Sequence, residues 1–235
     1  MDIVNYTNSL NALPTAQIQA LTRTELGLLT AAQATTLNAT FIGTLLPSQI
    51  PGLATDDLAL LTTAAIAGIL QNQVVGLSQE QMGAFTSTQL GALTGTAIGA
   101  LSKRQIAALN TDQVNNLSSA TLNLLTSSQI TFLELVDVAS LSSSSIAGLS
   151  EANLQSFTPK QVGALTTQQI SNLNTATLRA LTTVQVAGLG TDGLAILTDE
   201  SLAAFSESQL QAFRSTQIAS LTTAQFAALA SARWQ

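Results

Sequence analysis

Residues 85–109 read FTSTQLGALTGTAIGALSKRQIAAL. A large apolar residue opens a new unit every eight residues in this stretch, as Leu93 and Leu101 do. From Leu13 to Leu229, 28 such octads begin without an insertion or deletion, and their consensus is LTxxQIxA. One inserted residue would displace every later apolar side chain, so a register kept this long indicates that each octad fills an equivalent structural slot. The sequence therefore predicts a repeat protein.

The eight places of the octad differ in chemistry. The first and sixth places are apolar, the second is Ser, Thr or Asn in 20 octads, and the fifth is Gln in 15. Charged residues gather at the third and fourth places, which indicates that this side faces water. The last two places are mostly small, as expected where neighbouring backbones approach closely. We expect these first- and sixth-place residues in the core: Leu13, Ile18, Leu101, Ile106, Leu165, Ile170, Leu221 and Phe226.

The second and fifth places predict that a helix starts in every octad. One continuous helix would turn the apolar position by about 80° per octad and smear it around the axis. A Thr, Ser or Asn followed three residues later by Gln is the pattern of a capping box at a helix N-terminus. Helices of one to one and a half turns are unstable alone, so neighbouring octads must stack. The expected capping pairs are Thr86 with Gln89, Ser102 with Gln105, and Thr222 with Gln225.

The predicted fold is all-α: a right-handed solenoid of very short stacked helices, one per octad, in which two or more octads close a coil. A β-solenoid is the alternative, because regular Thr rows also occur on flat strand faces. The high Ala and Gln content and the low Val and aromatic content disfavour strands. In a strand, the five-then-three spacing of the apolar residues would also send them to opposite faces.

The domain organisation follows from the register. Residues 1–12 form a degenerate octad that we expect to cap the N-terminal end, residues 13–228 form a repeat domain of 27 octads, and residues 229–235 form a C-terminal capping octad that contains Trp234. Residues 1–10 lack the basic and apolar segments of a secretory signal peptide. No apolar run approaches the roughly 18 residues that a transmembrane helix needs.

Two kinds of deviation from the consensus mark special places. The stretch 130–140 (ITFLELVDVAS) is locally apolar and has lost both cap and Gln, so a bend, a junction or an interaction site is expected there. Four octads carry a large apolar residue at the eighth place and have Glu, Asp, Thr or Gly in place of Gln. For these four we expect a packing exchange, with the extra side chain buried: Leu28, Leu60, Leu124 and Ile196.

The composition excludes most enzyme chemistry. The chain has no Cys and no His, which removes thiolate sites, imidazole metal sites and histidine acid–base catalysis. Seven Lys and Arg residues against a net charge of −6 argue against nucleic-acid binding. The adjacent carboxylate pairs lack the spacing of a calcium loop. We therefore expect no enzyme, no catalytic residues, no cofactor and no metal site.

Three octads show a resemblance to a known kind of protein. The runs LTTAQFAA at 221–228, LTTQQISN at 165–172 and FTSTQLGA at 85–92 resemble the tandem LTxxQ octad arrays of large bacterial secreted or surface proteins of adhesin type. The resemblance covers almost the whole chain. It implies a bacterial, extracellular or cell-surface repeat module for display, spacing or adhesion, and it brings no catalytic residues with it.

The function expected from these observations is a non-enzymatic structural module that acts as a spacer, in adhesion or as a protein-binding scaffold. Its partner would be a protein or a surface, and self-association is also open. Two alternatives remain at this point. Ordered Thr rows could bind ice or another crystalline surface, and a secreted effector could bind a peptide in the groove of the solenoid.

Overall fold

The computed structural model describes Ile3, Tyr6 and residues 9–232. Over these residues the chain forms 26 α-helices and two 3₁₀ helices, and it forms no strand. The prediction of an all-helical solenoid is confirmed, and the β-solenoid alternative is wrong for the described residues. The predicted caps at 1–12 and 229–235 lie partly outside these residues, and Trp234 lies wholly outside.

The chain divides into two compact units, residues 1–116 and 117–235. The helices of unit 1 are η1 Leu10–Ala12, α1 Thr15–Ala20, α2 Arg23–Leu26, α3 Ala31–Ala34, α4 Ala39–Thr44, η2 Ile50–Gly52, α5 Thr55–Leu60, α6 Thr63–Ile66, α7 Gln71–Val74, α8 Gln79–Ala84, α9 Ser87–Ala92, α10 Gly95–Gly99, α11 Lys103–Ile106 and α12 Thr111–Asn115. The helices of unit 2 are α13 Ser119–Leu122, α14 Ser127–Ile130, α15 Leu135–Ser140, α16 Ser143–Ala147, α17 Glu151–Ser156, α18 Pro159–Gly163, α19 Thr167–Ser171, α20 Thr175–Ala180, α21 Thr183–Val186, α22 Thr191–Ala195, α23 Asp199–Ala203, α24 Glu207–Gln211, α25 Ser215–Ser220 and α26 Thr223–Ala232.

Extended residues separate one helix from the next. Phe85 (φ −65°, ψ 142°) and Thr86 (φ −74°, ψ 158°) are extended before α9, and Leu93 and Thr94 repeat this conformation before α10. The helix before them ends when the first-place N–H bonds to the sixth-place carbonyl, as Leu93 N–H does to Leu90 O at 3.3 Å. The first and second places thus turn the chain and begin the next helix.

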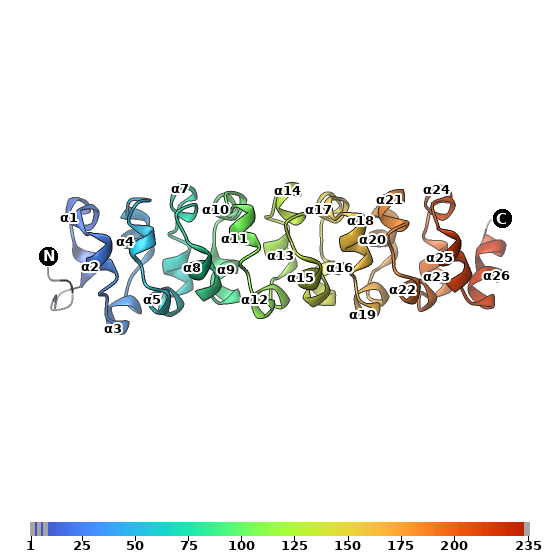
Figure 1. Cartoon of the computed structure of the whole chain (residues 1–235), viewed down its shortest axis with the longest axis horizontal. Helices are drawn as coiled ribbons and strands as arrows, with labels where there is room; N and C mark the ends of the chain where they lie inside the picture. The colour runs from blue at the N-terminus through green and yellow to red at the C-terminus, as the bar shows by residue number, and fades with distance from the viewer. Residues whose placement is uncertain (1–2, 4–5, 7–8, 233–235) are drawn as a thin grey trace. The chain divides into compact units, whose positions relative to one another are not determined.

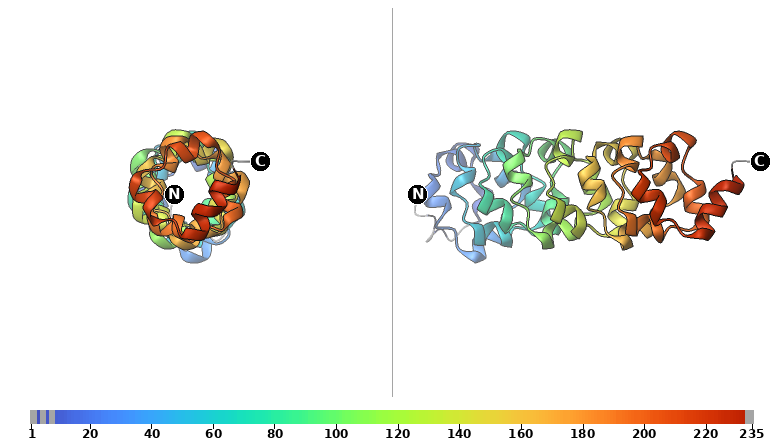
Figure 2. Two further views of the ribbon diagram at one scale, coloured as in Figure 1. Left: turned by 90° about the vertical axis from the view of Figure 1, so that its right-hand side faces the viewer. Right: turned by 45° about the vertical axis from the view of Figure 1, so that its right-hand side comes forward.

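Three octads close one coil, so each helix stacks on the third helix after it. In unit 1, α4 packs on α1, α10 on α7 and α11 on α8. In unit 2, α19 packs on α16, α22 on α19 and α25 on α22 (Figure 1). Viewed end-on, the helices of unit 2 run round a ring (Figure 2, left). The sequence left the number of octads per coil at two or more, and the structure gives three.

The first- and sixth-place side chains form the core of each unit. Six of the expected core residues are buried: Leu13, Ile18, Leu101, Ile106, Leu165 and Ile170. The other two are not. Leu221 is half-buried and Phe226 is 59% exposed. The prediction for Phe226 was wrong because a sixth-place side chain is covered by the coil that follows it, and no coil follows this one within the described residues.

Candidate functional site

The predicted capping pairs form reciprocal hydrogen bonds. The Thr86 backbone N–H donates to Gln89 Oε1 at 2.8 Å, and the Gln89 backbone N–H donates to Thr86 Oγ1 at 3.1 Å. The same two bonds measure 2.9 and 3.4 Å for Ser102 with Gln105, and 2.8 and 3.2 Å for Thr222 with Gln225. Each pair satisfies two N–H groups that a short helix leaves without an internal partner.

The fifth-place glutamine also joins one coil to the previous coil. Gln105 is buried, and its Nε2 donates to Val74 O at 2.7 Å and to Leu77 O at 3.0 Å. In unit 2, Gln217 Nε2 donates in the same way to Val186 O at 2.9 Å and Leu189 O at 2.8 Å. We call the set of these side chains the glutamine ladder. The other side chains that donate to the carbonyls 31 and 28 residues earlier are Gln49, Gln73, Gln81, Gln89, Gln113, Gln161, Gln169, Gln185, Gln209 and Gln225.

The capping box predicted only half of this arrangement. A Glu would satisfy a capping box as well as a Gln, because both offer the acceptor oxygen. Only Gln also carries the two donor hydrogens that the carbonyls of the previous coil require. Glu occurs at the fifth place only at Glu25. This preference for Gln was the signal in the sequence that could have revealed the bonds between coils.

Shorter polar residues replace the glutamine in some octads. Asn153 Nδ2 reaches Leu122 O at 2.8 Å and Leu125 O at 3.3 Å, and Ser145 Oγ reaches one carbonyl, that of Leu117, at 2.6 Å. Two aspartates, Asp57 and Asp137, also stand at this place and are buried. Burial raises the pKa of both carboxyl groups. The buried fifth place thus accepts shorter polar side chains in place of glutamine, with fewer or longer bonds to the previous coil.

A second link between coils involves the seventh place. Asn123 Nδ2 donates to Gly148 O at 3.1 Å, and its Oδ1 accepts from the Ser150 N–H at 2.8 Å. In unit 1, Asn11 makes the equivalent bonds at 2.8 and 3.0 Å. These bonds are exposed, and sequence reasoning missed them because it interpreted the seventh place only as a position for small residues where neighbouring backbones approach closely.

The threonine hydroxyls serve as helix caps. Thr62 Oγ1 and Thr94 Oγ1 each accept the backbone N–H of the residue three positions later, at 3.2 Å. These hydroxyls therefore belong to helix N-termini and not to a flat strand face. The flat strand faces on which the ice-binding alternative placed its Thr rows do not occur among the described residues.

Large apolar side chains lie exposed on the outer surface. The packing exchange expected at the eighth place was wrong, because Leu28, Leu60, Leu124 and Ile196 are all exposed. The eighth place is the last residue of its helix or lies just beyond the helix end, as Leu60 ends α5 and Leu28 follows α2, and its side chain points away from the core formed by the first and sixth places. Within the stretch 130–140, Leu135 and Val136 are exposed as well.

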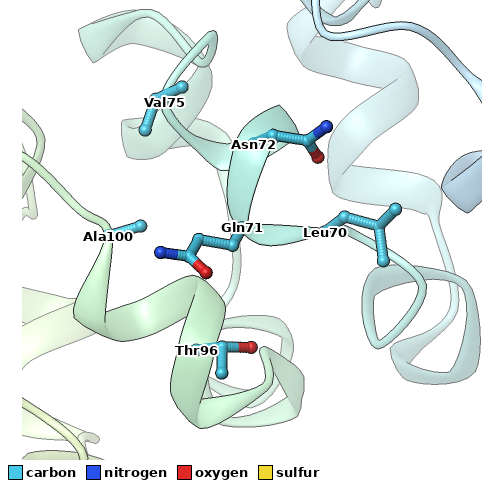
Figure 3. A pocket seen from close by; sticks show the side chains of 6 residues that line it. All are labelled: Leu70, Gln71, Asn72, Val75, Thr96 and Ala100. Carbon is cyan, nitrogen blue, oxygen red and sulfur yellow. The ribbon is translucent and has the colours of Figure 1, made fainter.

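A surface hollow of about 540 Å³ lies between the neighbouring helices α7 and α10 of unit 1. It is lined by Leu70, Gln71, Asn72, Val75, Thr96 and Ala100 (Figure 3). Leu70 is 50% exposed and Val75 is 59% exposed. The lining carries no charged group, so the hollow is suited to an apolar group with a few amide or hydroxyl contacts.

The part of the chain that the structure describes contains neither a cluster of metal ligands nor a helix that could span a membrane. No three Asp, Glu, His or Cys side chains gather there as metal ligands would. Among the same residues, none of the helices has the length and apolar character to cross a bilayer.

Two segments of the chain are similar to a known repeat family. The sequence model of the ALTTAQ repeat matches residues 84–119 and 130–167. No curated protein matches the chain. These two segments are thus similar to a described repeat family, and the LTxxQ resemblance is confirmed as far as the repeat itself.

Proposed function

We propose that this chain is a non-enzymatic scaffold that holds outward-facing side chains at fixed positions and presents them to a protein or surface partner. One observation carries the proposal: the repeated polar groups are used inside the fold. The ladder glutamines bond between coils, and the Thr and Ser hydroxyls cap helices. What remains for a partner is the variable third and fourth places and the exposed apolar side chains.

The proposed setting is the bacterial cell surface or the extracellular space, as a display, spacing or adhesion module. Support comes from the resemblance to LTxxQ arrays of adhesin type. A net charge of −6 and the absence of Cys are compatible with this setting. Extracellular labelling of intact cells would test the location, and a chain that stays unlabelled would contradict it.

The scaffold role predicts fixed distances within each unit. Because the chain has no Cys, two introduced cysteines can be spin-labelled without side reactions. Thr63 and Asp112 are exposed in unit 1, and Glu151 and Glu207 are exposed in unit 2. We expect a narrow distance distribution for each pair by electron–electron double resonance. Broad distributions, or a turnover activity that one outward substitution abolishes, would contradict the proposal.

A second candidate function is protein binding at the hollow between α7 and α10. The exposed Leu70 and Val75 beside the hollow support it. Val75→Glu should then weaken the binding of a partner selected against the whole chain. Val184→Glu is the matched control, since Val184 is equally exposed and lies in unit 2. Equal binding by both variants would place the partner elsewhere.

A further inference from the structure

The last coil of unit 2 exposes sixth-place side chains that are buried in every earlier coil of the unit. Ile218 on α25 is 45% exposed and Phe226 on α26 is 59% exposed. The residues 24 positions earlier, Leu194 and Leu202, are 0% exposed, because α25 packs on α22 and α26 packs on α23 (Figure 1). Within the described residues nothing covers the last coil in this way. Its open face is therefore a candidate interaction surface.

The same face carries backbone carbonyls that the glutamine ladder satisfies one coil earlier. Leu194 O and Leu197 O accept Gln225 Nε2 at 3.1 and 2.7 Å. The equivalent carbonyls 24 residues later are those of Ile218 and Leu221. Ile218 O accepts only the Leu221 N–H, at 3.2 Å, and Leu221 O accepts no hydrogen bond from a described residue. The face thus combines apolar side chains with acceptors that match a coil of this repeat.

The first coil of unit 1 carries a glutamine that matches these acceptors. Gln17 stands at the fifth place of its octad and is exposed. Pro14 at the second place has no N–H, so Gln17 forms no capping box. None of the described residues lies 31 or 28 positions before Gln17, and its side chain makes no hydrogen bond to any described residue. Its amide hydrogens therefore point to a partner outside the chain's own ladder.

We propose that copies of this chain associate head to tail, with the first coil of one copy covering the last coil of another. Gln17 Nε2 of the first copy donates to the carbonyls of Ile218 and Leu221 of the second, and the same coil covers Ile218 and Phe226. We assign this pair of carbonyls because Ile218 is exposed, whereas Leu210 at the other sixth place of the last coil is half-buried. The contact continues the coil-on-coil interface of the solenoid from one molecule into the next.

The chemistry of the two ends favours this direction. Two C-terminal ends would place acceptor carbonyls against acceptor carbonyls, and two N-terminal ends would lack the exposed apolar side chains. A head-to-tail contact leaves one end of each kind unused, so association continues beyond two copies. The contact goes beyond the proposed scaffold function, because it uses the ends of the chain and leaves the outward-facing third and fourth places available to another partner.

The first test is sedimentation velocity of the 235-residue chain from about 1 µM to 1 mM. The wild type should form species larger than a dimer as the concentration rises. Phe226→Glu should weaken association at least about tenfold, because a charge replaces the apolar anchor. Val184→Glu is the matched control, since Val184 is 63% exposed on α21, and it should associate as the wild type does. A wild type that stays monomeric, or Phe226→Glu that associates equally well, would overturn the proposal.

Mixing two variants tests the direction of the contact. Gln17→Glu removes the donor at the N-terminal end and should also weaken association at least about tenfold. The two substitutions lie at opposite ends, so Gln17→Glu and Phe226→Glu each keep one intact end. Their mixture should form a 1:1 dimer that grows no further, while each variant alone stays monomeric. Association of Gln17→Glu alone as strong as that of the wild type, or a mixture no heavier than its components, would overturn the proposal.

Discussion

At the scale of single residues, one glutamine makes the bonds that a helix cap and a coil contact would otherwise divide between two side chains. Gln169 accepts the Thr166 N–H at 2.7 Å, and its Nε2 donates to Val138 O at 2.9 Å and Leu141 O at 2.7 Å. A buried amide with all of these partners contributes about 1 kcal/mol per bond, and leaving its partners without a donor costs more. The ladder therefore fixes which coil lies beside which.

Gln169→Glu tests the donor separately from the cap. Glu keeps the acceptor for the Thr166 N–H and loses the hydrogens for the previous coil, so we expect a loss of about 2 to 3 kcal/mol in unfolding free energy at pH 7. The neighbouring Gln168 is exposed, and Gln168→Glu should change stability by less than about 0.5 kcal/mol. Urea denaturation measures both, and equal losses would contradict the role of Nε2.

At the scale of elements, helices of four to six residues form for two reasons. The free N–H groups at the start of each helix find hydrogen-bond partners within the same octad, and the neighbouring coils cover the apolar side of the helix. The second-place hydroxyl and the fifth-place amide lie close in sequence, so the helices could be predicted from the octad alone. Where the cap is missing, at Leu70, the Gln73 Oε1 still accepts the second-place N–H at 2.7 Å. Thr62 and Thr94 cap their helices although Ala stands at the fifth place, so either of the two signals is enough to begin a helix.

Thr166→Ala should remove one cap bond from α19 and reduce stability by about 1 kcal/mol. The hydroxyl that is lost accepts the Gln169 N–H at 3.2 Å. Thr167→Ala, one residue later on the exposed side, should be neutral or slightly stabilising, since Ala favours helix. Thermal and urea unfolding followed by circular dichroism compare the two, and a costlier Thr167→Ala would argue against the cap.

At the scale of the whole molecule, both units are built by the same 24-residue rule. The sequence predicted the octad, the helices and the core, since these depend on contacts within or next to an octad. It could not predict three octads per coil, because that number depends on the angle between successive helices. It also failed at Phe226 and Leu28, where exposure depends on which coil or turn lies alongside and not on the residue type.

The coil rule predicts how unit 2 responds to changes in length. Duplicating residues 157–180, one full coil, should preserve helicity per residue and cooperative unfolding, because every ladder bond finds an equivalent partner. One Ala inserted after Gly163 should reduce stability by about 2 kcal/mol or more, since it moves Gln169 away from its two carbonyls. Equal tolerance of both changes would mean that the register between coils is not fixed.

The exchange of glutamine side-chain amide hydrogens in water tests the central claim most directly. If Nε2 of Gln105 and Gln169 donates to carbonyls of the previous coil, their hydrogens should exchange more than about 100-fold more slowly than those of the exposed Gln71 and Gln168. ¹⁵N-resolved NMR of the whole chain distinguishes the two groups. Equally fast exchange at all four side chains would contradict the glutamine ladder.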